Sequence, residues 1–216
     1  MIRLYIVRHG KTQWNTESRM QGWKDTSLVE EGIHLAQLLG RRLATIDFTA
    51  VYTSPSGRTL QTTELLLNGR NIPVNKEPLL REMSFGMWEG KKKETIRKQF
   101  SDEYEMFWNK PHLYKAKTGE NYLDVQKRGL LGLKSIVMKH SDGDNVLIVS
   151  HCIMIKSLIY SMKKEAIDEF FWGKYSVPNG SLTVAEFHEG EFSLSFIGDT
   201  NYSKLDENII CRNKND

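Results

Sequence analysis

Cysteine is scarce in this sequence. Its 216 residues include two cysteines, Cys152 and Cys211, which are too few to build a disulfide framework. The N-terminus leads directly into an apolar segment and has no secretion-signal pattern. Because a chain without a disulfide framework is typical of reducing compartments, we expect a reduced, cytoplasmic protein.

Long hydrophobic runs and a strong charge imbalance are missing as well. The longest apolar runs have the length of a strand, well under the ~18 residues that a membrane-spanning helix needs. The 30 basic and 27 acidic residues leave a net charge of only +3, without the basic footprint of a nucleic-acid-binding protein. We therefore expect neither a membrane nor a nucleic acid as a partner.

Strand and helix patterns alternate along the chain. The strands are expected at Ile2–Arg8, Ala50–Thr53, 72–75, Asn145–Ser150, 181–187 and 192–197. The last two flank Glu189-Gly190 and are expected to form a hairpin. The helices are expected at 28–46, 58–67, 91–100, 123–139, 153–162 and 164–171. This alternation predicts an α/β fold, with a single three-layer α/β/α domain over residues 1–216 and a mostly parallel central sheet.

Residues 91–120 interrupt this alternation. The stretch 100–114 within them is rich in aromatic residues, contains Pro111 and has few periodic signals. We expect a small helical insertion or lid here rather than a second domain. Its aromatic side chains could cover a hydrophobic or ring-bearing substrate, or could simply form a small satellite core.

Two of the expected strands end in a histidine. Arg8-His9-Gly10 follows an unbroken apolar run, and Ser150-His151 ends a second one. Unbroken runs of this kind indicate strands that are buried on both faces, as in a parallel sheet. Open α/β sheets bind ligands at the carboxyl ends of such strands. The two histidines therefore indicate phosphoryl chemistry on a histidine.

Two other phosphate-handling motifs fail on spacing. Gly10-Lys11-Thr12 resembles the end of a P-loop, but the position that needs the first glycine is Tyr5, inside the strand. A cysteine phosphatase needs an arginine six residues after its nucleophile, whereas Leu158 stands there relative to Cys152. We interpret Cys152 as a small buried apolar residue.

The remaining four histidines, His34, His112, His140 and His188, lie in helical or loop patterns without a partner motif. No pair of histidines has the spacing of a helical zinc site, so no metal site is expected.

Two further segments supply candidate site residues. Ser54-Pro55-Ser56 is a helix-start signal that places Arg58 in a first helical turn, where a guanidinium suits a phosphate dianion. Glu82 precedes a turn rich in glycine and aromatic residues, and a carboxyl group beside apolar side chains suits a proton donor. The alternatives are a solvated Arg58 and a loop glutamate that merely pairs with Arg81.

Together these motifs resemble those of the histidine phosphatase superfamily, also called phosphoglycerate mutase-like. The segments that carry the resemblance are Arg8-His9-Gly10, Arg58 within Ser-x-x-x-Arg-x-x-x-Thr, Arg81-Glu82 and Ser150-His151. Further matches are Trp14-Asn15, Gln21-Gly22 with Asp25 and Leu28, and Pro178-Asn179-Gly180-Ser181, so the resemblance spans roughly residues 1–190. Lys11 departs from it, since many members carry glutamate there, and this bears on substrate preference.

The resemblance implies a mechanism without metal or other cofactor. His9 would attack phosphorus and become a phosphohistidine. Arg8, Arg58 and His151 would surround the phosphoryl oxygens and stabilise the transition state. Glu82 would protonate the leaving oxygen and then activate water. Asn15, Gln21 and Gly22 are expected to add to the phosphate-binding site.

The family contains phosphatases and mutases. Residues 80–86 here lack the Leu-Asn-Glu-Arg-His-Tyr-Gly-like stretch of the glycolytic mutases, and the insertion that follows is shorter. Both differences favour a phosphomonoester hydrolase acting on small phosphorylated metabolites, and activities like those of fructose-2,6-bisphosphatase and α-ribazole phosphatase belong to the same branch. A mutase and a non-catalytic phospho-ligand-binding protein remain alternatives, and a homodimer is possible.

Overall fold

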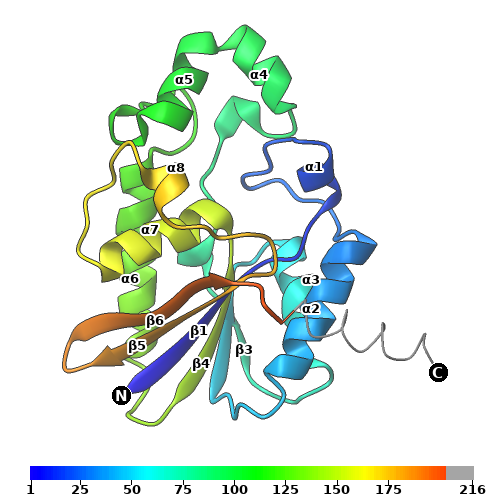
Figure 1. The fold of residues 1–216 in the computed structure, drawn as a ribbon, viewed down its shortest axis with the longest axis vertical. Coiled ribbons are helices and arrows are strands. Elements are labelled where there is room, and N and C mark those ends of the chain that lie inside the picture. Colours follow the sequence, from blue (N-terminus) through cyan, green and yellow to red (C-terminus); the bar gives the residue numbers. More distant parts are fainter. Residues whose placement is uncertain (203–216) are drawn as a thin grey trace.

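A six-stranded sheet forms the centre of the protein, in the strand order β3-β2-β4-β1-β5-β6 (Figure 1). The computed structural model describes residues 1–202, so Cys211 lies outside the described residues. The strands are β1 (Ile2–Arg8), β2 (Ala50–Thr53), β3 (Val74–Lys76), β4 (Asn145–Ser150), β5 (Leu182–His188) and β6 (Glu191–Asp199). Strands β1 to β4 pair in parallel, whereas β5 and β6 add an antiparallel edge. The predicted mostly parallel sheet is confirmed.

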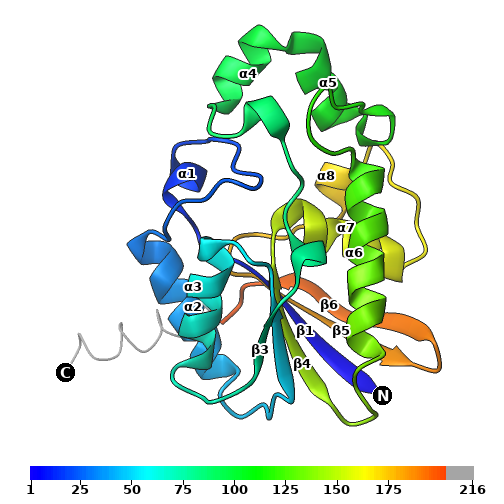
Figure 2. The ribbon, with the colours of Figure 1, turned by 180° about the vertical axis from the view of Figure 1, so that it is seen from behind.

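Helices cover both faces of this sheet. In the described chain they are α1 (Gln13–Thr16), α2 (Glu30–Arg42), α3 (Gly57–Leu67), α4 (Lys93–Gln99), α5 (Ser101–Asn109), α6 (Tyr122–Val137), α7 (Cys152–Met162) and α8 (Phe171–Lys174). Helices α2 and α3 lie on one side of the sheet, and α6 and α7 lie on the other (Figures 1 and 2). This arrangement is the predicted α/β/α order of layers.

The unbroken apolar run of strand β1, from Leu4 to Val7, is buried on both faces of the sheet. Leu4 and Ile6 point into the hydrophobic core under α6 and α7, whereas Tyr5 and Val7 point into the core under α2 and α3. Alternate side chains of residues 4–7 are therefore buried on opposite faces, whereas the polar residues of the strand, Arg3 and Arg8, lie near its ends and are partly exposed.

The register of the two central strands determines where the site forms. Arg8 pairs with Ser150 at the end of the β1–β4 ladder, and the backbone N–H of His9 donates to the carbonyl oxygen of Ser150 at 3.0 Å. His9 and His151 therefore follow adjacent parallel strands at the same edge of the sheet.

The C-terminal part confirms one prediction and overturns another. Strands β5 and β6 form the expected hairpin, and Glu189 and Gly190 in its turn both have positive φ. The predicted helix at 164–171 is wrong, because α7 ends at Met162 and Lys164 takes a left-handed φ of 57°. Within residues 163–202, the short α8 is the one helix that forms after α7. Helix α2 is also shorter at both ends than the predicted 28–46.

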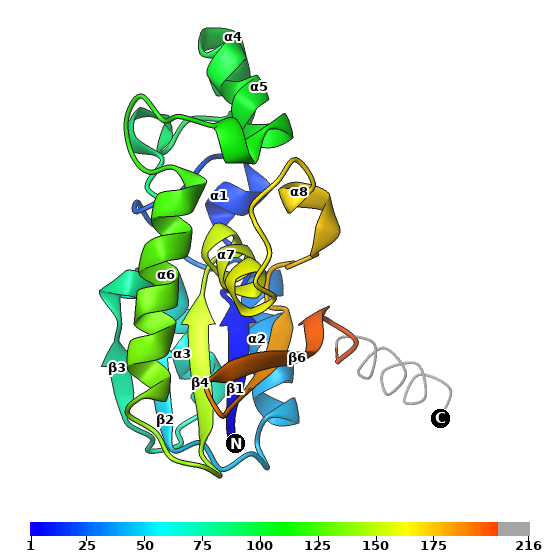
Figure 3. The same ribbon diagram turned by 90° about the vertical axis from the view of Figure 1, so that its left-hand side faces the viewer.

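The insertion lies above the carboxyl ends of the strands, with α4 and α5 farthest from the sheet (Figure 3). Phe107 is fully buried in it, with its ring centroid 5.2 Å from that of Tyr114 and 5.6 Å from that of Trp88. These aromatic residues belong to the same cluster as the core under α6 and α7, so they extend the main core instead of forming a satellite. No helix within residues 1–202 is long and apolar enough to cross a membrane.

Candidate active site

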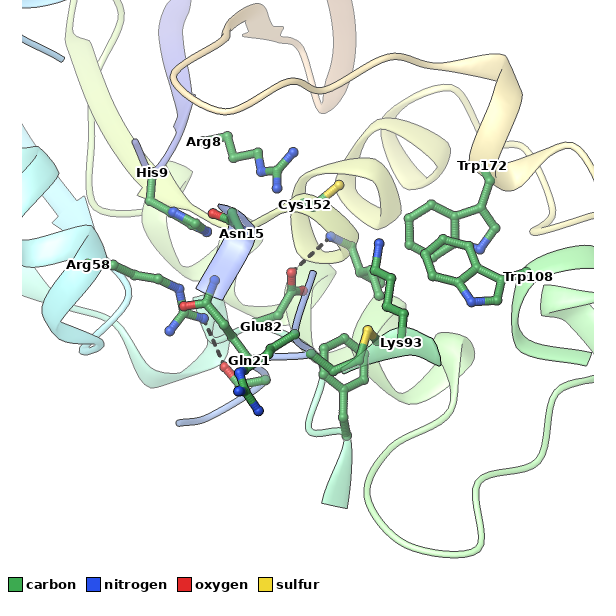
Figure 4. Close-up of a pocket in the computed structure, with 15 residues that line it drawn as sticks. Arg8, His9, Asn15, Gln21, Arg58, Glu82, Lys93, Trp108, Cys152 and Trp172 are labelled. Carbon is green, nitrogen blue, oxygen red and sulfur yellow. Dashed lines mark hydrogen bonds between the residues drawn. The ribbon is translucent and has the colours of Figure 1, made fainter. Parts of the chain in front are cut away.

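The predicted site residues meet at one cavity. It has a volume of about 260 Å³ and is lined by side chains from the end of β1, from the start of α3 and from the insertion (Figure 4). Its lining includes these predicted residues: Arg8, His9, Asn15, Gln21, Gly22, Arg58 and Glu82. His151 contacts this group from beside the cavity, with its ring centroid 5.3 Å from that of His9.

His9 is buried, with 3% of its surface exposed. Its Nδ1 lies 2.7 Å from the carbonyl oxygen of Gly10, and since a carbonyl oxygen can only accept, Nδ1 carries the proton. Nε2 therefore keeps its lone pair, and it has no hydrogen-bond partner among residues 1–202. Burial, together with the positive charges of Arg58 and Arg8, holds the pKa of His9 well below its usual value. The ring is neutral and suited to act as a nucleophile.

His151 is fully buried and also neutral. A guanidinium nitrogen of Arg58, Nη2, donates to Nδ1 of His151 at 3.0 Å, because a guanidinium has no acceptor. The proton of the neutral ring is therefore on Nε2, which donates to Oγ of Ser54 at 2.8 Å. Burial, followed by the charge of Arg58, holds the pKa of His151 well below its usual value.

Arg58 lies at the start of α3 and is 1% exposed. Its guanidinium donates to Oδ1 of Asp25 at 2.9 Å and to the carbonyl oxygens of Lys24 and Gly22, each at 2.8 Å. The Asp25 carboxylate also accepts from the backbone N–H of Arg58 at 3.1 Å, so it caps α3 and orients the arginine at once. An ion pair of this kind fixes the arginine beside the cavity.

Arg8 reaches the cavity from the end of β1. Its Nη1 donates to the carbonyl oxygen of Val177 at 2.7 Å. The Nε atoms of Arg8 and Arg58 are both buried and lack a hydrogen-bond partner among residues 1–202. Arg58 thus keeps one unused donor and Arg8 keeps several, and an anion bound in the cavity could accept hydrogen bonds from them.

The polar residues of the first loop are tightly fixed. Oδ1 of Asn15 accepts from the backbone N–H and the hydroxyl of Thr12, and from Nδ2 of Asn179 at 3.2 Å. Nε2 of Gln21 donates to the same Thr12 hydroxyl at 2.7 Å. Gly22 has a φ of +57°, and a Cβ there would lie 2.3 Å from Oε1 of Glu89, so only glycine fits.

The Glu82 carboxylate is held by backbone N–H groups. It is 8% exposed and accepts from Met83 at 2.9 Å, from Met154 at 3.2 Å and from Ile153 at 3.3 Å. The last two donors belong to the first turn of α7, so the surroundings are more polar than the expected apolar pocket. The side chain of Arg81 lies over the ring of Trp23 instead, 5.1 Å from its centroid, so the simple Arg81–Glu82 pair is not formed.

The cavity has further lining residues that the sequence reasoning did not assign to it. Lys93, at the start of α4, places its ammonium 4.7 Å from the ring centroid of Trp108, and burial lowers its pKa. Trp108 stacks against Trp172 with a centroid distance of 4.4 Å. A run of three lysines at 91–93 and the aromatic stretch 100–114 were the only signals, and neither says which side chain faces the cavity.

Trp172 is kept in place by a buried lysine on α7. The ammonium of Lys156 donates to the carbonyl oxygens of Phe171 at 3.0 Å and Trp172 at 3.2 Å, and also to that of Tyr175. It thereby binds the free carbonyl groups at the end of α8. In the described chain, no group of three or more His, Cys, Asp or Glu side chains is arranged to hold a metal ion.

Adjacent parallel strands bring two buried histidines and two arginines to one cavity, an arrangement suited to binding a phosphoryl group. The sequence profile of the histidine phosphatase superfamily (branch 1) matches residues 4–200. The chain belongs to this superfamily.

The similar proteins include phosphatases and mutases. The structure of YhfR from Bacillus stearothermophilus is 40% identical, with a TM-score of 0.90, and the match covers 94% of this chain and 99% of that one. Phosphoserine phosphatase 1 of Hydrogenobacter thermophilus is 28% identical over 189 residues, 88% of each chain. A 2,3-bisphosphoglycerate-dependent phosphoglycerate mutase of Bradyrhizobium diazoefficiens is 29% identical over 167 residues, 74% of this chain and 81% of the relative.

Proposed function

We propose that this protein is a metal-independent phosphomonoester hydrolase that works through a phosphohistidine at His9. One observation carries the proposal: the hydrogen bond from Nδ1 of His9 to Gly10 leaves the lone pair of Nε2 free beside Arg8 and Arg58. A nucleophile with two unpaired guanidinium donors next to it suits an incoming phosphate monoester.

In the first step, Nε2 of His9 attacks phosphorus and the bond to the leaving oxygen breaks. Nε of Arg8 and Nε of Arg58 donate to the phosphoryl oxygens and stabilise the charge of the transition state. The incoming dianion also favours a protonated His151, which can then donate to the phosphoryl group in place of accepting from Arg58. Asn15, Gln21 and Gly22 shape the same binding site.

Glu82 moves the protons of both steps. Like-charge repulsion between phosphate and carboxylate favours a proton between them, and this proton goes to the leaving oxygen. In the second step the carboxylate takes a proton from water, which attacks phosphorus. The N–P bond breaks, and inorganic phosphate leaves with neutral His9 restored.

Hydrolysis is favoured over mutase activity by the segment after Glu82. This segment differs from the corresponding mutase stretch, and the insertion that covers the cavity is short. The relatives carry names of both kinds, so the choice rests on these residues.

The cavity mouth favours a leaving group that bears an anion. Lys93 supplies an ammonium there, and the Trp108 ring beside it already contacts Trp172 and Phe107. Because these contacts cover part of the Trp108 ring, we assign it to the core and not to the binding of an aromatic substrate. Phosphoserine, which the Hydrogenobacter relative is named for, carries a carboxylate that would suit Lys93.

The test is a panel of phosphomonoesters, with phosphate release and phosphoglycerate isomerisation measured in parallel. We expect phosphate release from several monoesters, and little isomerisation of 3-phosphoglycerate. The His9→Ala variant is the control and should lose both activities. If isomerisation is faster than phosphate release, the protein is a mutase and the proposed hydrolase activity is wrong. Binding of the esters without any turnover by wild-type protein would leave only the ligand-binding alternative.

A further inference from the structure

One arginine on α6 holds the backbone segment that carries Glu82. Nη1 of Arg128 donates to the carbonyl oxygens of Leu79 at 2.9 Å and Arg81 at 2.7 Å, and Nη2 donates to that of Glu82 at 2.8 Å. Three carbonyl groups within four residues thus converge on a single guanidinium.

Glu120 completes this arrangement. Its carboxylate accepts from Nε of Arg128 at 2.7 Å and from Nη2 at 2.9 Å, so all five N–H donors of the guanidinium are used. Oε2 of Glu120 also accepts from the backbone N–H of Ser84 at 2.8 Å. Arg128 and Glu120 together therefore bind the backbone before and after the Glu82 side chain, at residues 79–82 and at residue 84.

The pair is mostly shielded from solvent and carries no net charge. The side chains of Arg128 and Glu120 are 16% and 19% exposed. Because the two charges cancel locally, the pair affects the cavity more by fixing the backbone around Glu82 than by its electrostatic field. Nε1 of Trp23 also donates to the Glu82 carbonyl oxygen, at 2.9 Å, so two side chains fix this carbonyl group.

We propose that Arg128, oriented by Glu120, is a positioning residue for proton transfer by Glu82. The inference rests on the proposed acid role of Glu82. Proton transfer needs the donor within hydrogen-bond reach of the leaving oxygen. A lysine at position 128 keeps the charge and can pair with Glu120, but it cannot reach three carbonyl groups as a planar fork does.

The experiment measures the rate of phosphoenzyme formation from an alkyl phosphate and from p-nitrophenyl phosphate. A poor alkoxide leaving group needs the proton most, whereas nitrophenolate leaves with little help. We expect Arg128→Lys to slow the alkyl phosphate by about 10- to 100-fold, since a misplacement of about 1 Å can cost that much. The aryl phosphate should be slowed far less. Glu120→Gln should give the same pattern in weaker form.

A double variant separates positioning from a general loss of structure. In the Glu82→Gln background, Arg128→Lys should cost less than about twofold, because residues that act through one another are not additive. Arg70→Lys is the matched control. Arg70 also holds backbone carbonyl groups, those of Leu43, Ile46 and Leu66 among them, but it lies away from the cavity. The Arg70→Lys substitution should change the thermal stability, but any change in the rate of phosphoenzyme formation should be the same for both substrates.

The outcomes distinguish this inference from the proposed function. If Glu82→Gln shows the leaving-group dependence and Arg128→Lys slows both substrates equally, the positioning role is overturned and the acid role stands. Full additivity of the two substitutions would overturn it as well. If Glu82→Gln itself shows no leaving-group dependence, the acid role fails and the inference falls with it.

Discussion

Nη2 of Arg58 lies 3.0 Å from Nδ1 of His151, and the same guanidinium contacts Asp25 through Nη1 at 2.9 Å. Two acceptors from distant parts of the chain therefore hold one buried arginine. The side chain is therefore fixed beside the cavity before any ligand arrives, and binding an anion there needs no further ordering of it.

Asp25→Asn should weaken anion binding while the fold persists. The substitution removes the charge that orients Arg58, and a hydrogen bond between charged groups contributes about 1.5–3 kcal/mol. We expect the inhibition constants of phosphate and vanadate to rise by roughly tenfold or more. Asp47→Asn, at an exposed position, is the control and should leave them unchanged. Unchanged inhibition constants in Asp25→Asn would show that Arg58 binds anions without being oriented by the Asp25 carboxylate.

The two buried histidines predict acid sensitivity of the fold. Their pKa values are lowered in the native state, by burial first, so the unfolded chain binds protons below pH ~6.5 that the native protein does not. Stability is therefore at its full value above that pH and falls as the pH decreases toward the lower native pKa values.

Urea unfolding of wild type and His9→Asn at pH 7 and pH 5.5 measures this effect. The variant should lose less stability on acidification, by up to about 1.4 kcal/mol per pH unit for one histidine. His188→Asn removes an exposed histidine from β5 and should behave as wild type. An identical pH dependence in wild type and His9→Asn would contradict the cost of protonating His9.

Charge stabilisation by Arg8 and Arg58 predicts activity that does not depend on a metal ion. Vanadate and phosphate should inhibit competitively, and EDTA should leave turnover intact. In a crystal, a bound phosphate should lie about 2.7–3.2 Å from donors of both arginines. Activity that disappears with EDTA and returns only with Mg²⁺ or Zn²⁺ would refute this account.

The sequence predicts His9, His151 and Arg58 as site residues because their positions follow from the strand patterns. His9 and His151 each come directly after a buried strand, and the β1–β4 register alone brings them together. Arg58 is predictable for the same reason, since it starts the helix after the neighbouring strand β2. Local pattern and global fold agree at these positions.

The surroundings of Glu82 and the residues around the cavity mouth were not predictable, because they depend on contacts between distant segments. Two of the three backbone partners of Glu82 lie about 70 residues away on α7, where no local pattern marks them. Trp172 directly follows the segment 164–171, for which a helix was predicted, but the left-handed turn at Lys164 interrupts the helical path. Arg128 has the pattern of an ordinary helix-surface arginine, although all its donors are bound.

The central claim is that His9 carries the phosphoryl group, and rapid-quench labelling tests it most directly. Wild-type protein mixed with a labelled phosphomonoester and quenched in alkali should carry phosphate that is stable to alkali and labile to acid. Peptide mass spectrometry should place this phosphate on His9, and the folded His9→Ala variant should form none and lose nearly all turnover. Wild-type turnover in His9→Ala, or label found on Cys152 or another residue, would contradict the account.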